Sequence, residues 1–444
     1  MRNALEELVE IPNETELNDA DMIEAHADLI TSENDVAQFQ DQLDRASQGS
    51  DNLVGMADAI ADENSSELAV GIVQEQYNAL INSLGVKRRL PATEGLGFSD
   101  RRKVVVESIK SLAADIWSKL VTFLKNLAVR VKYFFANLLD FGSKLGKKAD
   151  QISAAAKKVM SAEPKAKSWS TLSEDGAPPY ITNKLLTRHY EQAAVSEKFD
   201  ISRIFMKDGD PSKLTDLIKS ATIDSDKTIA TYVEKISNTE KGMKADIDAM
   251  LKGDTQGFKS QLIKELDLNR IRAAEKEHGV YIHAPRGGVP VDIADLSKYI
   301  NGIRIMARDS ASSDRERMQN SGFAFTELNV PMLDLEVIPD LLKGVDGSLK
   351  KLKDLTKKIP DILVLANNLE RDSTKAAGED FDRRKLISAL VRLLARLTVA
   401  GITQMRNGAT GLLRSIVLHS SISVVKAAQA AKVDVPGFGL RFSQ

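Results

Sequence analysis

The chain of 444 residues contains no cysteine, which excludes disulfides, thiolate metal sites and cysteine nucleophiles. Aromatic residues are scarce, at 5%, and glycine and proline are fewer than an all-β or low-complexity chain would carry. The longest runs without a charged residue span about eleven residues, at 76–86 and 415–425, well short of the ~20 needed to cross a bilayer. These absences indicate a soluble, mainly α-helical protein.

Motifs of known chemistry are missing as well. The sequence has no G-x-x-x-x-G-K-[ST] phosphate loop, no H-E-x-x-H zinc motif and no G-x-S-x-G nucleophile motif. Its five histidines are dispersed, and no pair of carboxylates stands in the isolated apolar setting that general acid–base catalysis uses. We therefore predict that the protein is not an enzyme and has no catalytic residue, cofactor or metal site.

Charge is distributed very unevenly along the chain. Residues 1–94 carry a net charge of −15, whereas residues 95–444 carry +13. Blocks of opposite sign are typical of interaction segments, removable pro-segments or tails. Apolar residues are few and weakly spaced over 1–60, so we expect its helices to be marginal or to depend on a partner. A more apolar helix is predicted at about 66–84.

The charge changes sign within a connection at residues 85–98. One proline, Pro91, and three glycines, Gly85, Gly95 and Gly97, predict an exposed and extended segment there.

The next stretch, from about 99 to 160, has the rhythm of a long amphipathic helix. Its apolar residues recur every three or four positions: Val105, Ile109, Leu112, Ile116, Leu120, Phe123, Leu127, Val131, Phe134 and Leu138. Lysines and arginines lie mostly off this face, which predicts a basic amphipathic helix or hairpin, broken near Gly142 and Gly146. We interpret the apolar face as part of a core; the alternative is a surface that meets membrane or nucleic-acid phosphate.

The remaining sequence predicts a linker and a large domain. Residues 161–180 have a linker composition. Beyond it, patterns predict helices at 181–197, 211–220, 225–250, 255–279, 291–311, 335–358, 360–370 and 380–431, with short strands at 279–283 and 323–330. We thus predict a mainly α fold in four parts: an acidic helical segment 1–94, a basic helical region 95–160, a linker 161–180 and a mainly helical domain 181–444 with minor β.

Part of this sequence resembles a known family. Tyr77, Leu80 and Leu84-Gly85 are followed by Pro91-Ala92-Thr93-Glu94, then by Ser108-Ile109-Lys110 and Ile116-Trp117. This order is similar to that of internal head (inner-body) proteins of giant tailed phages of the phiKZ type. There, an acidic helical pro-segment ends in Leu-Gly and is followed by a Pro-Ala-x-Glu connection and a basic helix with Ile-Trp.

The resemblance implies a processing site. A prohead protease of that family is expected to cut after Glu in a [Ser/Ala/Gly]-x-Glu pattern, which Ala92-Thr93-Glu94 followed by Gly95 satisfies. The same pattern ends at Glu67 and at Glu163, which are the alternatives. Because a protease binds an extended and exposed strand, the Pro/Gly setting favours Glu94 over Glu67, which lies beside a helical pattern. Pro164 disfavours a cut after Glu163.

The resemblance also implies a role. We expect a structural protein of the phage head interior, present in the host cytoplasm during assembly, whose partners are other head proteins, the prohead protease and packaged DNA bound by non-specific electrostatics. Whether it is ejected with the genome and how it oligomerises stay open. The alternatives are a membrane-active protein that uses 99–141 and 384–432, and an enzyme of unrecognised fold within 181–444.

Overall fold

The computed structural model describes most of the helical core of the protein. The described residues are 20–62, 65–83, 95–174, 176–181, scattered positions between 215 and 241, 280–283, 285, 290, 292–307, 330–357, 381–406 and 411–435. The helices predicted at 181–197, 255–279 and 360–370 lie outside these residues, and those predicted at 211–220 and 225–250 fall mostly outside them.

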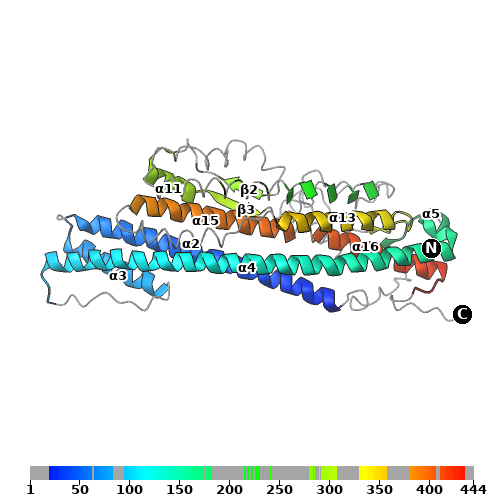
Figure 1. Ribbon diagram of the computed structural model, residues 1–444, viewed down its shortest axis with the longest axis horizontal. Coiled ribbons are helices and arrows are strands. Elements are labelled where there is room, and N and C mark those ends of the chain that lie inside the picture. Colours follow the sequence, from blue (N-terminus) through cyan, green and yellow to red (C-terminus); the bar gives the residue numbers. More distant parts are fainter. Residues whose placement is uncertain are drawn as a thin grey trace, which may run out of the picture.

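The fold is mainly α, as predicted, and elongated (Figure 1). Its helices are α2 (Ala20–Ala61), α3 (Glu67–Ser83), α4 (Phe98–Ala162), the 3-10 helix η1 (Pro164–Lys167), α5 (Trp169–Leu172), α11 (Ile293–Asn301), α13 (Ile338–Thr356), α15 (Phe381–Gln404) and α16 (Leu412–Ala431). The short strands are β1 (Tyr180–Ile181), β2 (Val280–His283), β3 (Arg304–Ala307) and β4 (Val330–Pro331).

Helix α4 runs the length of the molecule (Figure 1). The predicted apolar rhythm is its buried face: Val105, Ile109, Leu127, Phe134 and Leu138 are fully buried. The prediction of a long helix is therefore confirmed.

The predicted break near Gly142 and Gly146 is wrong, because α4 continues through both to Ala162. Each glycine faces Leu349 of α13. A Cβ atom at Gly142 would lie 3.2 Å from Leu349 Cδ2, and one at Gly146 would lie 3.6 Å from Cδ1. The glycines therefore serve close helix packing rather than chain reversal.

Helix α2 lies antiparallel to α4. The rings of His26 and Phe141 pack at a tilt, with centroids 5.5 Å apart. Asp62, just past the other end of α2, accepts a hydrogen bond at its backbone oxygen from Arg102 Nη1 at 2.8 Å. Within residues 1–60, whose helices we expect to be marginal or to depend on a partner, the structure shows the 42-residue helix α2, which packs against α4 of the same chain.

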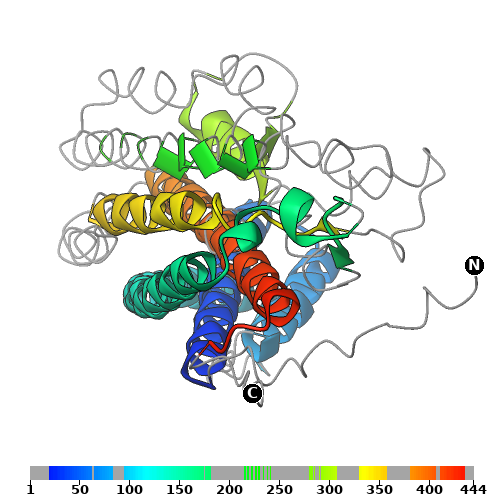
Figure 2. The same cartoon turned by 90° about the vertical axis from the view of Figure 1, so that its right-hand side faces the viewer.

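The other long helices complete the bundle. Viewed along its axis, α4 lies between α2 and α13, with α16 across from it (Figure 2). Helix α15 packs against α2 on one side and against α11 and β3 on another. Both α15 and α16 come from the apolar and basic stretch 380–431, and most of their side chains are buried, so this stretch supplies much of the core.

Two small antiparallel pairs of strands accompany the helices. Strand β2 pairs with β3, with Tyr281 opposite Met306, which confirms the strand predicted at 279–283. The single helix predicted at 291–311 is wrong beyond Asn301. There the chain turns at Gly302, where a Cβ atom would lie 2.6 Å from Pro285 Cγ, and continues as β3. Of the strand predicted at 323–330, only Val330 is described, and it lies in β4.

Residues 161–180, with their linker composition, make a fixed set of contacts. Trp169 is buried, and its Nε1 donates to the Leu333 oxygen at 2.9 Å. The Trp169 backbone N–H donates to Asp334 Oδ1 at 2.8 Å, and β1 pairs with β4, with Tyr180 opposite Pro331. The segment is thus hydrogen-bonded to the chain that leads into α13.

Candidate processing site and the interface of the acidic segment

The candidate cut site lies just before α4. Ala92, Thr93 and Glu94 fall outside the described residues, whereas Gly95 is described. Gly95 has φ +90, a backbone conformation that favours glycine, and it is exposed together with Leu96 and Gly97. The three residues that follow the candidate scissile bond are therefore accessible and lie outside any helix.

Glu67, the first alternative, is the first residue of α3. Its carboxylate accepts a hydrogen bond from Arg101 Nη1 of α4 at 3.3 Å. A protease would have to unwind the start of α3 to bind this residue in an extended form.

Glu163, the second alternative, lies between α4 and η1. Its backbone N–H donates to the Val159 oxygen at 2.9 Å, which ends α4, and its Oε1 accepts from the Lys165 N–H at 3.1 Å, which begins η1. Pro164 occupies the next position. Glu163 is thus held by its backbone and its side chain.

Charged side chains join the acidic segment (residues 1–94) to the body (residues 95–444). Sequence reasoning found the opposite net charges but not the pairs themselves, because nothing in the sequence says which acid meets which base. Four such ion pairs are Asp35 with Arg130 at 2.8 Å, Glu67 with Arg101 at 3.3 Å, Asp44 with Arg396 at 3.2 Å, and Glu33 with Arg406.

Two of these pairs are largely shielded from water. The side chains of Arg396 and Asp44 are 15% and 19% exposed, and Arg396 Nη1 also donates to the Ile303 oxygen at 3.1 Å. Glu33, which meets Arg406, is buried as a residue. Shielded charges of this kind are screened by salt much less than surface pairs.

An apolar seam accompanies the charges. Side chains of α2 that are 0% exposed include Leu29, Val36, Leu43, Ala57 and Ile60. In α3, Val70 and Tyr77 are fully buried as well. All of them belong to the same hydrophobic cluster as the buried face of α4, so the acidic segment shares the core of the body.

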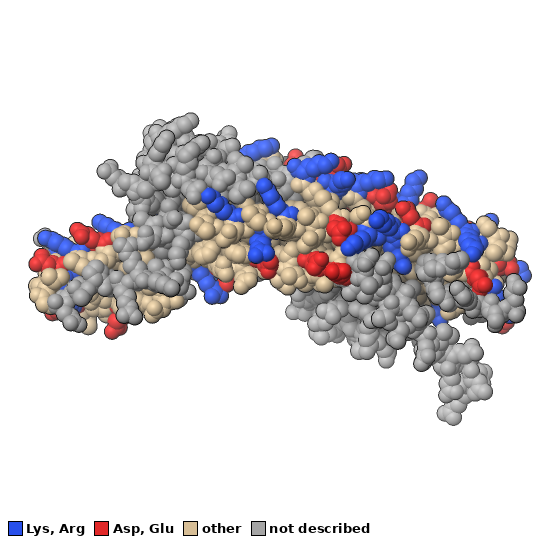
Figure 3. All heavy atoms as spheres, turned by 60° about the horizontal axis from the view of Figure 1, so that its bottom comes forward, with Lys and Arg blue, Asp and Glu red and all other residues tan. Residues whose placement is uncertain are grey.

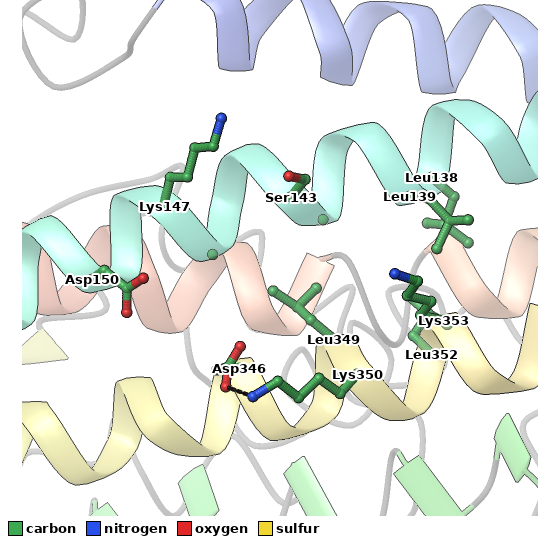
Figure 4. Close-up of a pocket in the computed structure, with 12 residues that line it drawn as sticks. Leu138, Leu139, Ser143, Lys147, Asp150, Asp346, Leu349, Lys350, Leu352 and Lys353 are labelled. Atoms are coloured by element: carbon green, nitrogen blue, oxygen red, sulfur yellow. Dashed lines mark hydrogen bonds and ion pairs between the residues drawn. The ribbon is translucent and has the colours of Figure 1, made fainter.

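A groove of about 470 Å³ lies between α4 and α13. Figure 4 shows Lys147 and Asp150 on α4, and Asp346, Lys350 and Lys353 on α13. Lys350 Nζ donates to Asp346 Oδ2 at 2.6 Å, and this neighbour raises the pKa of Lys350. The groove is lined by lysines and aspartates of both charge signs and by two glycines. These described residues do not form a cluster of converging groups of the kind that catalysis uses.

One buried titratable group stands apart from these surfaces. His419 of α16 is fully buried, and Nε2 lies 2.9 Å from the Pro331 oxygen, to which it donates. Burial lowers the pKa of His419 to about 4, so the ring is neutral at pH 7. Within the part of the chain that the structure describes, no group of His, Asp and Glu is arranged to hold a metal ion.

One described helix is long and apolar enough to cross a membrane. This is Lys385–Thr403 within α15, of which 83% is buried inside the bundle. A core helix passes the same test of length and composition, and the burial of α15 agrees with that role.

The comparisons with known proteins bear on the first part of the chain. Residues 10–180 match the family of phiKZ-like phage internal head proteins, which confirms the resemblance found in the sequence. The match contains α2, α3, α4, η1 and α5 and ends at the first residue of β1. Neither the curated proteins nor the solved structures gave a match. The family is one of structural proteins of the head interior.

Proposed function

We propose that this chain, a phiKZ-like internal head protein by its residues 10–180, is made with an acidic N-terminal segment that the prohead protease cuts after Glu94. The basic body then associates with packaged DNA. The observation that carries the proposal is that the family match spans the point where the charge changes sign. At this point Gly95, Leu96 and Gly97 are exposed.

The local structure supports Glu94 over its alternatives. Glu67 begins a helix and Glu163 caps one, so both would need local unfolding before cleavage. Glycines at positions 95 and 97 give the chain freedom to adopt the extended form that proteases bind.

The test of the site is a set of matched glutamine variants. Glu94→Gln removes the charge that the protease reads while it keeps the size of the side chain, and it should leave the particle-borne protein at full length. Glu67→Gln and Glu163→Gln should be processed like the original chain. Full processing of Glu94→Gln would refute the assignment.

Electrostatics support the DNA association. With residues 1–94 tethered, the chain totals −2, whereas the body alone carries +13. On the face seen in Figure 3, Lys and Arg side chains follow one long edge, with Asp and Glu among them. Such a surface suits weak, sequence-independent contact with phosphates.

The DNA association is tested by salt dependence. The logarithm of the DNA affinity of the body alone, separated from residues 1–94, should fall linearly with the logarithm of salt concentration, with a slope of about −0.9 per phosphate contacted. The full-length chain should bind more weakly than this body at each salt concentration. Equal affinity of these two forms, or binding that ignores salt, would contradict the proposal.

Membrane activity is the second candidate, and the observation behind it is the apolar stretch Lys385–Thr403. To insert into lipid, α15 would have to leave the core in which it is buried. Leakage of dye from anionic liposomes measures this directly. Leakage caused by the processed protein at neutral pH would favour this function, because a protein that only contacts DNA need not permeabilise lipid.

A further inference from the structure

We infer that the cut after Glu94 does not by itself release the acidic segment: the body has a binding surface for an acidic amphipathic helix, and α2 stays on it as a separate chain. This inference rests on the proposed processing. The product of the cut is then a complex of two chains, 1–94 and 95–444, rather than a body from which the segment has been removed.

The surface is long and its register is continuous. Along α2, contacts run from His26 with Phe141, through Asp35 with Arg130, and just past its end to Asp62 with Arg102. Residue numbers rise on α2 as they fall on α4, as an antiparallel helix pair requires. At 1.5 Å per residue, the stretch from 26 to 62 covers about 54 Å.

Further contacts fill the register between these points. Asn137 Nδ2 donates to the Asp28 oxygen at 3.3 Å and reaches Ser32 Oγ at 3.4 Å. The Arg130 guanidinium also lies over the Phe39 ring, 5.5 Å from its centroid. Helix α2 therefore meets α4 turn after turn rather than at one end.

The apolar seam, not the charge, gives the surface its main strength. Leu29, Val36 and Leu43 are 0% exposed, and release of α2 would expose them to water together with the α4 face that they cover. The free energy of such apolar burial scales with area and does not weaken as salt is raised.

The ion pairs set the register along this seam. Asp35 meets Arg130 on α4, whereas Asp44 and Glu33 meet Arg396 on α15 and Arg406 just past its end. Arg414 Nη1 lies 3.2 Å from His26 Nδ1. A partner of this surface must therefore be both apolar on one face and acidic at these positions, which describes α2 and not a nucleic-acid strand.

The family match agrees with this unit. It runs without interruption through α2, α3 and α4, and so across the cut. The part of the chain that resembles the family contains both sides of the helix pair.

The cut then changes the nature of the contact rather than ending it. Before cleavage, α2 is tethered to its surface at a high effective concentration. After cleavage, α2 belongs to a separate chain, so its dissociation depends on concentration. Cleavage makes release possible without causing it.

The experiment uses the full-length protein with residues 88–94 replaced by the recognition sequence of a site-specific protease. After complete cutting, the two fragments should elute together on size exclusion in both 150 mM and 1 M NaCl, and separate only in denaturant. Elution of the body without the 1–94 fragment, at either salt concentration, overturns the inference.

A pair of neighbouring substitutions tests whether the apolar seam keeps the 1–94 fragment bound to the body. Val36 is buried, whereas Ala37 is exposed. After cutting, Val36→Asp should elute as separated fragments, and Ala37→Asp should remain a complex. Equal retention of both variants would contradict a role for the seam. If Val36→Asp fails to fold, co-elution of the cut chain without substitutions still decides the question.

This test is independent of the natural processing. The inserted site is cut by an added protease, so retention can be measured even if the prohead protease never cleaves at Glu94. A chain uncut in particles would refute the proposed function, whereas separation of the fragments after the engineered cut would refute this inference alone.

Discussion

Arg396 of α15 and Asp44 of α2 form a two-pronged ion pair across the boundary between the body and the acidic segment. Nη2 lies 3.2 Å from Oδ1, and Nε lies 3.3 Å from Oδ2. The same guanidinium donates to the Ile303 oxygen, which precedes β3. One side chain thus joins the acidic segment, the core helix and the β2–β3 pair.

Replacing Asp44 with asparagine should destabilise the protein. The substitution leaves the Arg396 charge largely buried without a counter-charge, a change that costs 3–5 kcal/mol at fully buried sites and here, with some solvent access, about 2 kcal/mol. Urea unfolding followed by circular dichroism measures it. Asp41→Asn on the same helix is the control, since Asp41 pairs with Arg45 at side-chain exposures of 57% and 74% and should change stability by less than about 0.5 kcal/mol.

Gly142 is predicted to be a packing position. Gly142→Leu would push a side chain into Leu349 and should lower the free energy of unfolding by about 2 kcal/mol. Gly344→Leu on α13 is the matched control. No atom lies within 4 Å of a Cβ there, so leucine should stabilise the helix by about 0.5–1 kcal/mol. Equal effects of the two substitutions would show that Gly142 does not serve the helix contact.

Acid should weaken the fold through His419. Its pKa is lowered to about 4 in the folded protein, so the unfolded chain binds a proton first as pH falls below about 6.5. The contribution of neutral His419 to the free energy of unfolding is therefore fully present above pH 6.5. It is lost as pH falls toward 4, by about 3 kcal/mol in all.

His419→Gln keeps an N–H donor for the Pro331 oxygen but does not titrate. The free energy of unfolding of this variant should therefore depend less steeply on pH between 6.5 and 4 than that of the original chain. Parallel pH profiles for the two proteins would show that His419 does not account for the loss.

The sequence predicted those parts of the fold that depend on local pattern. The apolar rhythm from Val105 to Leu138 gave α4 and its buried face, because an amphipathic helix records in its own spacing which side faces a core. The break predicted at Gly142 was wrong for a related reason. A glycine signals missing steric bulk, and only the position of Leu349 shows that a neighbouring helix uses the space.

The contacts between segments that lie far apart in the sequence could not be predicted from local pattern. The weak apolar spacing of residues 20–61 gave no sign that α4 would cover them, and the charges gave no sign that Asp44 would meet Arg396. For the candidate site, the sequence predicted an exposed connection around Glu94, and Gly95 is exposed, whereas the capping role of Glu163 emerged only from its hydrogen bonds.

The cut after Glu94 is tested most directly by the intact mass of this protein recovered from mature particles. We expect a body that begins at Gly95, accompanied by the 1–94 fragment in equal amount when the proteins are extracted without denaturant. A single species that begins at Met1 would contradict cleavage at Glu94.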